Sequence, residues 1–434
     1  MTFIDARDVP ADNNSTERLA TTGLDYRVVD LSDDTSAFSF HRAVDRGFLD
    51  PEPSDAMLAH MRRRFEERRN IGVFEQDASK GALPMATINS WVARLTVPGG
   101  SEMAMWAISA VTVAATHRRR GIARALLEGE LRAAASAGVP IAGLTATEAT
   151  IYGRYGFGPA IPVARFTVDT RRAGWGGPTV PGRLELVDRE ELAVDLGAVH
   201  DRARRDVSGR IPGWEGRWDE FAGLAPTPDR DQVRGVRYRD DEGVLRGAMA
   251  YTVAEVDGSL RFRMTIRLLV AETAEARAAL LRFALKHDLV DEVVSDLRPL
   301  DDPLPWLVRD TRGVKQEAHD HGWLRILDLP AALEARSYSA ALDTVIRVED
   351  SLGFAAGDWH VLIDDAGVAK VQRAAEGIDV DITLDVATLS ALYAGGVRAQ
   401  SLHGAGRIAA EDSAVEALDR ALVAFPLPSL DIFF

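Results

Sequence analysis

One stretch decides the fold: Val111-Thr112-Val113-Ala114-Ala115-Thr116-His117-Arg118-Arg119-Arg120-Gly121-Ile122-Ala123-Arg124-Ala125-Leu126-Leu127. It predicts a buried strand ending at Val113, a short basic loop, and a helix from near Gly121 to about Ala135. The first N–H groups of a helix lack partners within it, and the helix dipole favours anions there. A glycine at this point lets a phosphate approach the backbone closely, and arginines add charge-assisted hydrogen bonds. The stretch therefore predicts a pyrophosphate site.

A solvated basic helix start is the alternative interpretation. The chain offers a comparison in Arg62-Arg63-Arg64, another triple arginine, with no glycine after it and no apolar strand before it. We interpret that run as a solvated helix face. The preceding strand, the loop length and the Gly121-x-Ala123 spacing favour an anion site for the run at 118–120.

Length and composition limit the function further. At roughly 100–200 residues per domain, the 434 residues predict two to four domains. The 51 Lys and Arg against 66 Asp and Glu give a formal charge of −15, which argues against a nucleic-acid binder and suits a protein that attracts cations. The absence of cysteine excludes disulfides, thiol nucleophiles and Cys-ligated zinc, and no metal site is predicted. No apolar run is long enough to span a bilayer and the N-terminus lacks signal-peptide character, so a cytoplasmic location is expected.

Patterns on either side of the opening stretch predict an α+β chain. Residues 1–22 are expected to be a flexible tail, and the Gly- and Pro-rich segment 173–181 a linker. Strands are predicted at 71–74, 84–92, 105–113, 141–144, 246–255, 259–270, 344–348, 359–363 and 379–384. Helices are predicted at 38–48, 54–70, 274–287, 331–341, 386–393 and 413–422. The hairpin turning at Asp257-Gly258 and the helix after it faintly repeat the strand–helix pattern of 105–135, without its basic turn.

The motifs resemble those of a known family. Arg118 to Ala123 matches the acyl-coenzyme-A signature of the GNAT superfamily, Arg/Gln-x-x-Gly-x-Gly/Ala. The segments Ile151–Ala160 and Leu95–Gly100 are similar to motifs of the Eis (enhanced intracellular survival) N-acetyltransferases of actinobacteria. Ala115 departs from the proline that is frequent there, which should change loop stiffness more than chemistry.

The resemblance implies two tandem GNAT acetyltransferase-like domains plus a C-terminal sterol-carrier-protein-like domain. The catalytic acetyl-CoA-binding domain would span 23–172. A second domain without cofactor would span 173–325, where Glu272 and Glu275 would repel a pyrophosphate. The sterol-carrier-like domain would span 326–434 and end in the active site. The family also implies a hexamer.

The resemblance further implies site residues. Acetyl-CoA would be bound by Val111, Thr112, Val113, Arg118, Arg119, Arg120, Gly121, Ile122, Ala123, Arg124, Thr147 and Glu148, with the N–H of Val113 as candidate donor to the thioester oxygen. Tyr152 would be the general acid, the alternative being a core tyrosine. The C-terminal carboxylate of Phe434 would be the general base. The alternatives are a terminus packed only for stability, or His117, Glu148 or Asp50 as base.

The acceptor is inferred from charge. Amines are cations at neutral pH, so an acidic, aromatic pocket is expected. The resemblance implies that this pocket is lined by Phe48, Asp50, Glu52, Trp91 and Trp106, which lie in stretches that flank the site in the family. Either tryptophan could equally belong to the core. The implied reaction is direct acetyl transfer to primary amines, most of all aminoglycosides at several positions. A protein lysine or a polyamine is the alternative acceptor, and an apolar-ligand carrier with a vestigial transferase domain is the alternative of another class.

Overall fold

The computed structural model describes residues 4–256, 258 and 260–434, so Asp257 of the predicted hairpin turn lies outside the described residues. Contacts within the chain divide it into two compact units. Unit 1 contains residues 4–160 and 322–424 together with Phe434, and unit 2 contains residues 161–321 and 425–433. The boundary falls inside β6 (Gly158–Asp169) and β12 (Val314–Ile326) and not in the segment 173–181. It falls there because β6 pairs with β11 of unit 2 and the end of β12 pairs with β5 of unit 1.

Unit 1 is built on a sheet with the strand order β1–β2–β3–β4–β5–β12. Besides the end of β12, its strands are β1 (Leu24–Val28), β2 (Arg69–Glu75), β3 (Ala86–Thr96), β4 (Glu102–Val113) and β5 (Ile141–Thr145). Neighbouring strands are antiparallel except β4 and β5, which are parallel. The strands predicted between residues 71 and 144 are confirmed, with shifted ends.

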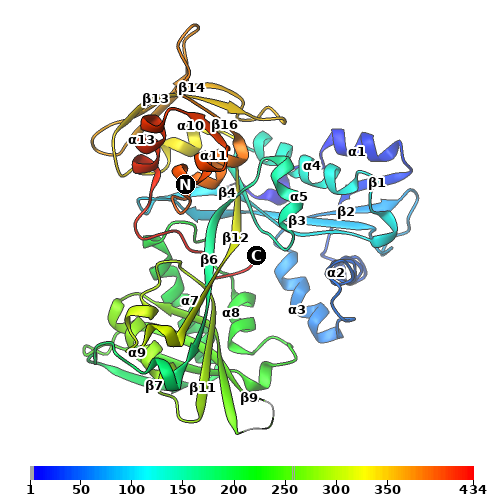
Figure 1. Cartoon of the computed structure of the whole chain (residues 1–434). Helices are drawn as coiled ribbons and strands as arrows, with labels where there is room; N and C mark the ends of the chain where they lie inside the picture. Colours follow the sequence, from blue (N-terminus) through cyan, green and yellow to red (C-terminus); the bar gives the residue numbers. More distant parts are fainter. Residues whose placement is uncertain (1–3, 257, 259) are drawn as a thin grey trace. The chain divides into compact units, whose positions relative to one another are not determined.

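Helices cover both faces of this sheet. Figure 1 shows α1 (Asn13–Ala20) and α4 (Ile122–Ser136) on one face, and α2 (Asp34–Phe48) and α3 (Asp55–Phe65) on the other. The apolar stripe of α4, including Ile122, Leu126 and Leu131, is buried in a core that also contains Trp106 of β4. Helix α3 ends earlier than predicted because the chain from Arg69 onward joins β2.

The N-terminal segment corrects the prediction of a flexible tail. Asp12 caps α1 by accepting a hydrogen bond from the Ser15 N–H at 2.8 Å, and Leu19 is buried in the core. The Ser15 hydroxyl donates to the Ala125 carbonyl of α4 at 2.7 Å. This polar run is folded because its serine finds a buried partner on another helix, which local composition does not reveal.

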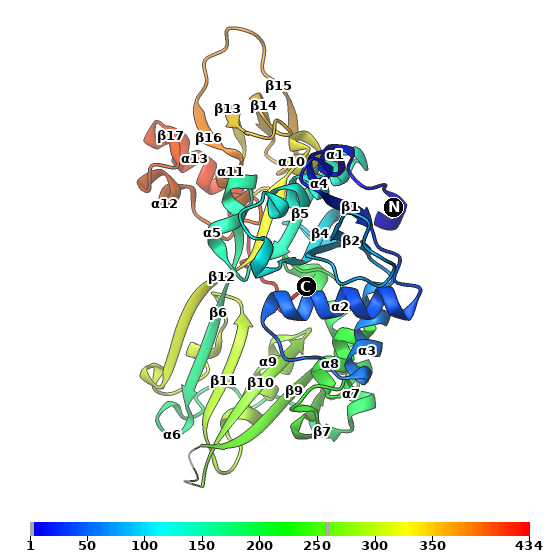
Figure 2. The ribbon, with the colours of Figure 1, turned by 90° about the vertical axis from the view of Figure 1, so that its right-hand side faces the viewer.

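The C-terminal segment forms a second sheet in unit 1, in the order β15–β14–β13–β16–β17. Its elements are α10 (Leu329–Glu334), β13 (Leu342–Glu349), β14 (Gly357–Ile363), β15 (Ala369–Arg373), β16 (Ile382–Asp385), α11 (Val386–Leu392), α12 (Ala399–Gly404), β17 (Ile408–Ala410) and α13 (Asp412–Leu422). Figure 2 shows α11, α12 and α13 gathered beside the strands. The helix predicted over 331–341 ends at Glu334, because Arg336 is buried and donates to the carbonyls of Tyr393 and Leu422.

Unit 2 repeats the first sheet of unit 1. Its strand order is β7–β8–β9–β10–β11–β6, antiparallel except for the parallel pair β10 and β11. Its elements besides β6 are α6 (Thr170–Ala173), β7 (Arg183–Val187), α7 (Arg189–Ala203), α8 (Glu215–Ala222), β8 (Arg234–Arg239), β9 (Leu245–Val256), β10 (Arg261–Ala271), α9 (Ala274–Leu285) and β11 (Val290–Arg298). Each pair of neighbouring strands runs in the same relative direction as the corresponding pair in the sheet β1–β2–β3–β4–β5–β12 of unit 1, so the internal repeat is present. The antiparallel pair β9 and β10 confirms the predicted hairpin.

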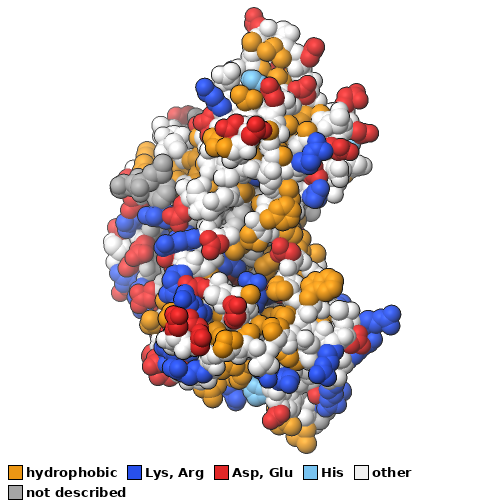
Figure 3. Space-filling model, turned by 90° about the vertical axis from the view of Figure 1, so that its left-hand side faces the viewer, with side chains coloured by type: hydrophobic (Ala, Val, Ile, Leu, Met, Phe, Trp, Pro, Cys, Tyr) orange, Lys and Arg blue, Asp and Glu red, His pale blue; other side chains and the backbone are white. Residues whose placement is uncertain are grey.

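The surface carries charges of both signs. On the face drawn in Figure 3, acidic and basic side chains lie interspersed despite the net charge of −15. Among the described residues, no helix has the length and apolar character to cross a bilayer.

Candidate active site

A β-bulge in β4 leaves the end of this strand open toward β5. On β3, Thr87 pairs with Thr112 but Asn89 pairs with Ser109, so two residues of β4 face one residue of β3. One of the two, Ala110, has a φ of 52°, in the left-handed region that alanine rarely adopts. The parallel pairing with β5 covers only the part of β4 from Met105 to Ile108. A bulge bends its strand, so the residues from Ser109 onward run beyond the paired region.

The backbone of Val113 faces this opening. The N–H of Ala114 donates to the Met85 carbonyl at 2.7 Å, and Thr112 pairs with Thr87. In an antiparallel ladder, the residue between two hydrogen-bonded pairs turns its N–H and C=O to the other side. Val113 therefore presents its N–H away from β3, as a donor to the thioester oxygen would require.

Helix α4 begins without a side-chain cap. Gly121 is the N-cap residue with a φ of 77°, and no side chain bonds to the first-turn N–H groups. The first intrahelical bond runs from the Ala125 N–H to the Gly121 carbonyl at 3.0 Å, so the three residues between them have free N–H groups in the helix. A Cβ at Gly121 would lie 3.0 Å from the Arg18 guanidinium. Glycine therefore keeps this helix terminus accessible, as an anion site would require.

The predicted arginines around α4 are engaged to different degrees. Arg118 and Arg119 are exposed, and neither has an ion-pair partner among the residues that the structure describes. Arg120 donates to the Thr22 carbonyl at 3.2 Å, and Arg124 forms an ion pair with Glu128 at 2.6 Å. Two of the four guanidinium groups are thus available to an anion without breaking a contact.

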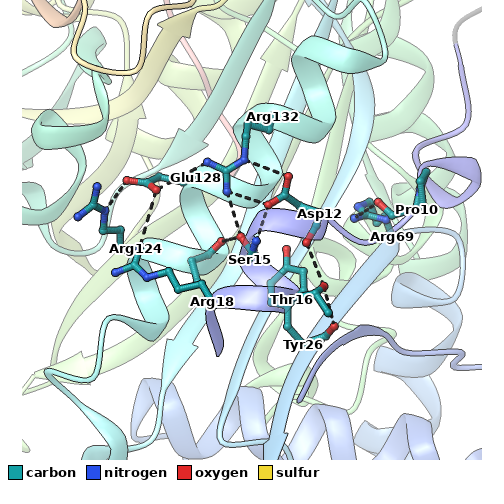
Figure 4. A network of polar contacts seen from close by, with 11 residues as sticks. Pro10, Asp12, Ser15, Thr16, Arg18, Tyr26, Arg69, Arg124, Glu128 and Arg132 are labelled. Carbon is teal, nitrogen blue, oxygen red and sulfur yellow. Dashed lines mark hydrogen bonds and ion pairs between the residues drawn. The ribbon is translucent and has the colours of Figure 1, made fainter. Parts of the chain in front are cut away.

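Arg18 of α1 belongs to the same cluster and was not among the predicted residues. Figure 4 shows the polar network that holds α1 on α4, with Arg132 paired to Asp12 at 2.7 Å. In the same network Arg18 lies 3.9 Å from Glu128, which also holds Arg124. The sequence offered no signal for Arg18, because its place depends on the folding of a segment that resembles a tail.

Tyr152 closes the short helix α5 (Ala149–Tyr152), directly after β5. Its buried ring lies 6.1 Å from the ring of Phe157, edge to face, and 6.3 Å from that of Trp323. Its hydroxyl has no hydrogen-bond partner within the described part of the chain. Burial, and after it the charge of Glu148, raises the pKa of Tyr152, so the hydroxyl keeps its proton at neutral pH. An aromatic clamp with a free hydroxyl suits a proton donor to a ligand.

The last residue, Phe434, belongs to unit 1 and lies at the end of β5. The Thr145 hydroxyl donates to the Phe434 carbonyl oxygen at 2.8 Å and accepts from the Phe434 N–H at 3.4 Å. The Phe434 ring packs edge-on against Trp91 with 5.6 Å between ring centroids, and the Arg68 guanidinium lies 3.6 Å from the Trp91 ring centroid. Thr145, which was not among the predicted residues, thus holds the last residue of the chain by two hydrogen bonds.

Tyr152 and Phe434 are brought to the same end of β5. Thr145, which binds Phe434, is paired with Gly322 in the β5–β12 ladder. The next ladder position pairs Leu144 with Trp323, whose ring contacts Tyr152. Both contacts are therefore made at adjacent ladder positions near this end of β5, where the side chains of Thr145 and Trp323 point to opposite faces of the sheet.

The acidic end of α2 lies beside the same opening. Gly47 packs so closely on Thr112 of β4 that a Cβ would come within 2.3 Å of the threonine Cβ. Phe48 and Asp50, which follow Gly47, are exposed. Glu52 forms an exposed ion pair with Arg42 at 2.9 Å. The predicted acceptor residues from 48 to 52 are therefore close to the free end of β4.

Asp45, one helical turn before this end, was not predicted. Its Oδ2 is buried without a hydrogen-bond partner in the described part of the structure. Burial raises the pKa of Asp45 to about 6, with smaller contributions from the charges of Asp50 and Glu52. This carboxyl titrates close to neutral pH beside the candidate acceptor region.

Trp106 is a correction. It is fully buried, and its indole N–H donates to the Glu130 carboxylate at 3.1 Å, which also accepts from Arg69 at 3.1 Å. This tryptophan belongs to the core and does not line an acceptor pocket, whereas Trp91 contacts Phe434. A tryptophan on a strand has the same sequence pattern whether it packs in the core or lines a pocket. The sequence therefore could not distinguish the place of Trp106 from that of Trp91.

The remaining predicted residues fall in the loops around the opening. Thr147 and Glu148 are exposed between β5 and α5, where Glu148 accepts from the Thr150 hydroxyl at 2.9 Å. His117, an alternative base, bonds to the Glu75 carboxylate at 2.8 Å. No group of three or more metal-ligating side chains occurs among the residues described.

Three family models match successive parts of the chain. Residues 30–160 and 210–326 each match an acetyltransferase (GNAT) domain, and residues 329–429 match a sterol carrier protein domain. These ranges confirm the predicted architecture of two tandem GNAT domains and a sterol-carrier-like domain.

Relatives extend over most of the chain. A protein of Streptomyces avermitilis named "Uncharacterized N-acetyltransferase" is 33% identical over 88% of this chain and 92% of its own length. N-acetyltransferase Eis of Mycobacterium tuberculosis is 34% identical over 74% of this chain and 78% of its own length. The crystal structure of Eis1 from Mycobacterium abscessus superposes with a TM-score of 0.79 at 30% identity, over 94% of this chain and all of that one. A GCN5-related N-acetyltransferase from Anabaena variabilis shares the fold, with a TM-score of 0.79 at 18% identity over 94% of this chain and all of that one. The chain belongs to the Eis family of GNAT N-acetyltransferases.

Proposed function

We propose that this acyltransferase moves an acetyl group from acetyl-CoA directly to a primary amine, with Tyr152 as general acid and the Phe434 carboxylate as general base. The observation that carries the proposal is the arrangement in unit 1. The free strand end at Val113 belongs to β4, and Tyr152 and Phe434 make their contacts at adjacent ladder positions of the neighbouring strand β5. Acetyl transfer needs a donor to the carbonyl oxygen, an acid for the leaving thiolate and a base for the amine, in one place.

The donor substrate would be held mainly through its phosphates. The free N–H groups after Gly121, together with Arg118 and Arg119, would bind the pyrophosphate, with Arg18, Arg120 and Arg124 around it. Val111 and Thr112 would line the path of the pantetheine along β4, with Thr147 and Glu148 on the β5 side. The Val113 N–H would donate to the thioester oxygen as negative charge develops on it.

The acid and the base would then complete the transfer. The Phe434 carboxylate would accept a proton from the ammonium group of the acceptor, which frees the nitrogen lone pair for attack on the carbonyl carbon. As the C–S bond breaks, the Tyr152 hydroxyl would donate its proton to the leaving thiolate, and the second proton that the nitrogen loses on becoming an amide would restore the tyrosine. The raised pKa of Tyr152 keeps that proton available at neutral pH. No protein nucleophile is required, in keeping with a chain that has no cysteine.

The acceptor is proposed to be an aminoglycoside, which carries several amines. Asp45 and Asp50 would carry negative charge near the end of α2 and attract such a polycation, with Glu52 beside them in its ion pair with Arg42. A protein lysine or a polyamine is the second candidate, since the same charges would attract either. The carrier alternative is disfavoured by the free hydroxyl of Tyr152 and the uncapped start of α4, which an apolar-ligand carrier does not need.

The test follows free thiol released from acetyl-CoA with kanamycin, a lysine peptide, spermidine or no acceptor. The absence of cysteine leaves the product as the source of thiol signal. We expect acceptor-dependent release that is fastest with kanamycin. Thiol release that does not increase with any acceptor would contradict the transferase proposal. Faster release with the peptide or spermidine than with kanamycin would contradict the aminoglycoside as the acceptor.

The base has its own test, in which a few residues are appended after Phe434. The extension moves the carboxylate away from Thr145 and should lower kcat about 100-fold or more. The same residues appended at the N-terminus are the control and should leave kcat unchanged. Full activity with the C-terminal extension intact would rule out the terminal carboxylate as base.

A further inference from the structure

The loop that carries Tyr152 rests on a buried arginine. Arg325 of β12 is fully buried, and its Nε donates to the Tyr155 carbonyl at 2.7 Å. Tyr155 lies in the 3₁₀ turn Gly153–Tyr155, which follows Tyr152 without a break. The position of the Arg325 guanidinium therefore fixes the backbone three residues beyond the proposed acid.

The arginine is in turn held by Asp350, which follows β13. Nη2 of Arg325 donates to Oδ1 of Asp350 at 2.7 Å, and both side chains are inaccessible to solvent. Burial alone would raise the pKa of Asp350, but the charge and hydrogen bond of Arg325, together with hydrogen bonds from the Ala355 and Leu352 N–H groups, outweigh it, so the pKa lies below its usual value. Asp350 also accepts from the N–H groups of Leu352 and Ala355 at 3.0 and 2.9 Å, which fixes its orientation. The pair is therefore rigid and fully bonded.

The same loop lies directly on α11 of the sterol-carrier-like domain. Gly156 has a φ of 85°, and a Cβ there would meet Nε of Arg325 at 2.5 Å and a methyl of Val386 at 2.7 Å. At Gly158 a Cβ would come within 2.0 Å of the Ala387 carbonyl oxygen. Both glycines thus allow a backbone approach that any side chain would prevent. Phe157 between them is buried, with its ring against Tyr152.

We propose that the Arg325–Asp350 pair positions the Tyr152 hydroxyl for proton donation, so that the sterol-carrier-like domain is a working part of the acetyl-transfer site. Two supports for the Tyr152 loop, Asp350 and α11, come from that domain. Arg325 and Asp350 touch neither substrate nor reacting atoms, so they are positioning residues. The proposal rests on the proposed role of Tyr152 as general acid.

The experiment is a double-mutant cycle on kcat, measured by thiol release from acetyl-CoA. Arg325→Met keeps an unbranched side chain about as long as the arginine stem but removes the guanidinium and its bond to Tyr155. It should lower kcat about 10- to 100-fold, because small misplacements of a catalytic group cost rates of this order. KM for acetyl-CoA should change less than about twofold, since the α4 terminus is untouched. In a Tyr152→Phe background, Arg325→Met should lower kcat less than about twofold further, because Arg325 acts through the hydroxyl that is already gone.

Two further variants separate positioning from folding. Arg325→Met alone leaves the Asp350 charge buried and unpaired, which destabilises the fold. The double variant Arg325→Met/Asp350→Asn removes both charges and keeps one acceptor oxygen, so one of the two backbone bonds from Leu352 and Ala355 is lost. It should melt at a higher temperature than Arg325→Met alone, because no buried charge is left unpaired, and still show the loss in kcat. Arg336→Met is the control for loss of a buried arginine in unit 1, since Arg336 is also buried but donates to Leu422 and to Tyr393 at the C-terminal end of α11, and not to the Tyr152 loop itself.

The outcomes distinguish the role of Tyr152 as general acid from the positioning role of the Arg325–Asp350 pair. Undiminished kcat in Tyr152→Phe would overturn the assignment of the acid and this proposal with it. A low kcat in Tyr152→Phe that falls again by the full Arg325→Met factor would overturn the positioning role alone. The positioning role would also fail if Arg336→Met lowered kcat as much as the Arg325→Met/Asp350→Asn variant.

Discussion

The sheets of units 1 and 2 have corresponding strand orders, but they differ where their two parallel strands separate, at β4 and β5 in unit 1 and at β10 and β11 in unit 2. In unit 1, β4 continues past its pairing with β5 into an opening beside Val113. In unit 2, β10 also has a register shift against β9 near Arg267, but the buried Arg298 of β11 donates to the Leu269 carbonyl at 3.3 Å. Arg298 is also paired with Asp302 at 2.6 Å. A buried ion pair thus satisfies a strand carbonyl of β10 beyond its pairing with β11.

The helices after these strands differ in the same sense. At the start of α4, Gly121 offers no side chain to the free N–H groups. At the start of α9, the Thr273 hydroxyl accepts from the Ala276 N–H at 3.1 Å. Beside it, Glu272 is in an ion pair with Arg246 at 3.3 Å. Both units therefore contain the strand and the helix that follows it. Unit 1 differs in having an uncapped helix start and an open strand end, the two features that we expect an anion site to need.

The largest effect is expected from Arg298→Met in unit 2. It leaves Asp302 buried without its partner and should lower the free energy of unfolding by about 3–5 kcal/mol. Arg261→Met is the control, because the Arg261–Asp291 pair is exposed at the arginine and should be worth less than about 1 kcal/mol. Chemical denaturation measures both. Equal losses in the two variants would show that the Arg298 pair is not a structural element of the second unit.

The next effect is expected from Gly121→Asp in unit 1. Asp tolerates the left-handed backbone, caps the helix and brings a negative charge to the proposed pyrophosphate site, so Kd for acetyl-CoA should rise about 100-fold. Thr273→Ala removes the corresponding cap in unit 2. It should cost about 1 kcal/mol of stability and leave that Kd unchanged. Calorimetric titration measures both, and a shift in Kd with Thr273→Ala would contradict the assignment of binding to unit 1.

Sequence reasoning captured the parts of the fold that depend on local pattern. The strand and helix around Gly121 follow from apolar periodicity. The repeat in unit 2 follows from the same sequence pattern, a strand followed by a helix. Ala110 could not be foreseen, because its left-handed backbone is imposed by pairing with β3 and not by its residue type. Helix α1 was missed because Ser15 and Asp12 find their partners on α4, more than a hundred residues away. The seat of Phe434 on Thr145 is likewise a contact between distant parts of the chain.

The smallest effect concerns two carboxyls, the half-buried Asp45 on α2 and the buried Asp195 on α7. Burial raises the pKa of both, that of Asp45 to about 6, but Asp195 has Arg237 at 3.2 Å whereas Asp45 Oδ2 has no hydrogen-bond partner in the described chain. A raised carboxyl pKa gives stability that is present below about pH 4 and lost as pH rises through 6. Asp45→Asn should therefore stabilise by about 1 kcal/mol at pH 8, after discounting for solvent screening, and by about half as much at pH 5. Asp195→Asn should gain less at pH 8, because it loses the attraction of Arg237.

Thermal unfolding of both variants at pH 8 and pH 5 checks this difference. An equal gain for Asp45→Asn at the two pH values would contradict the ionisation of Asp45 as its cause.

The most direct measurement is the stoichiometry of acetyl-CoA binding to the full chain by calorimetric titration. The proposed asymmetry between the units predicts one molecule per chain in the wild type, with binding lost or severely weakened in Gly121→Asp and unchanged in Thr273→Ala. Two molecules per chain, or undiminished binding in Gly121→Asp, would contradict it.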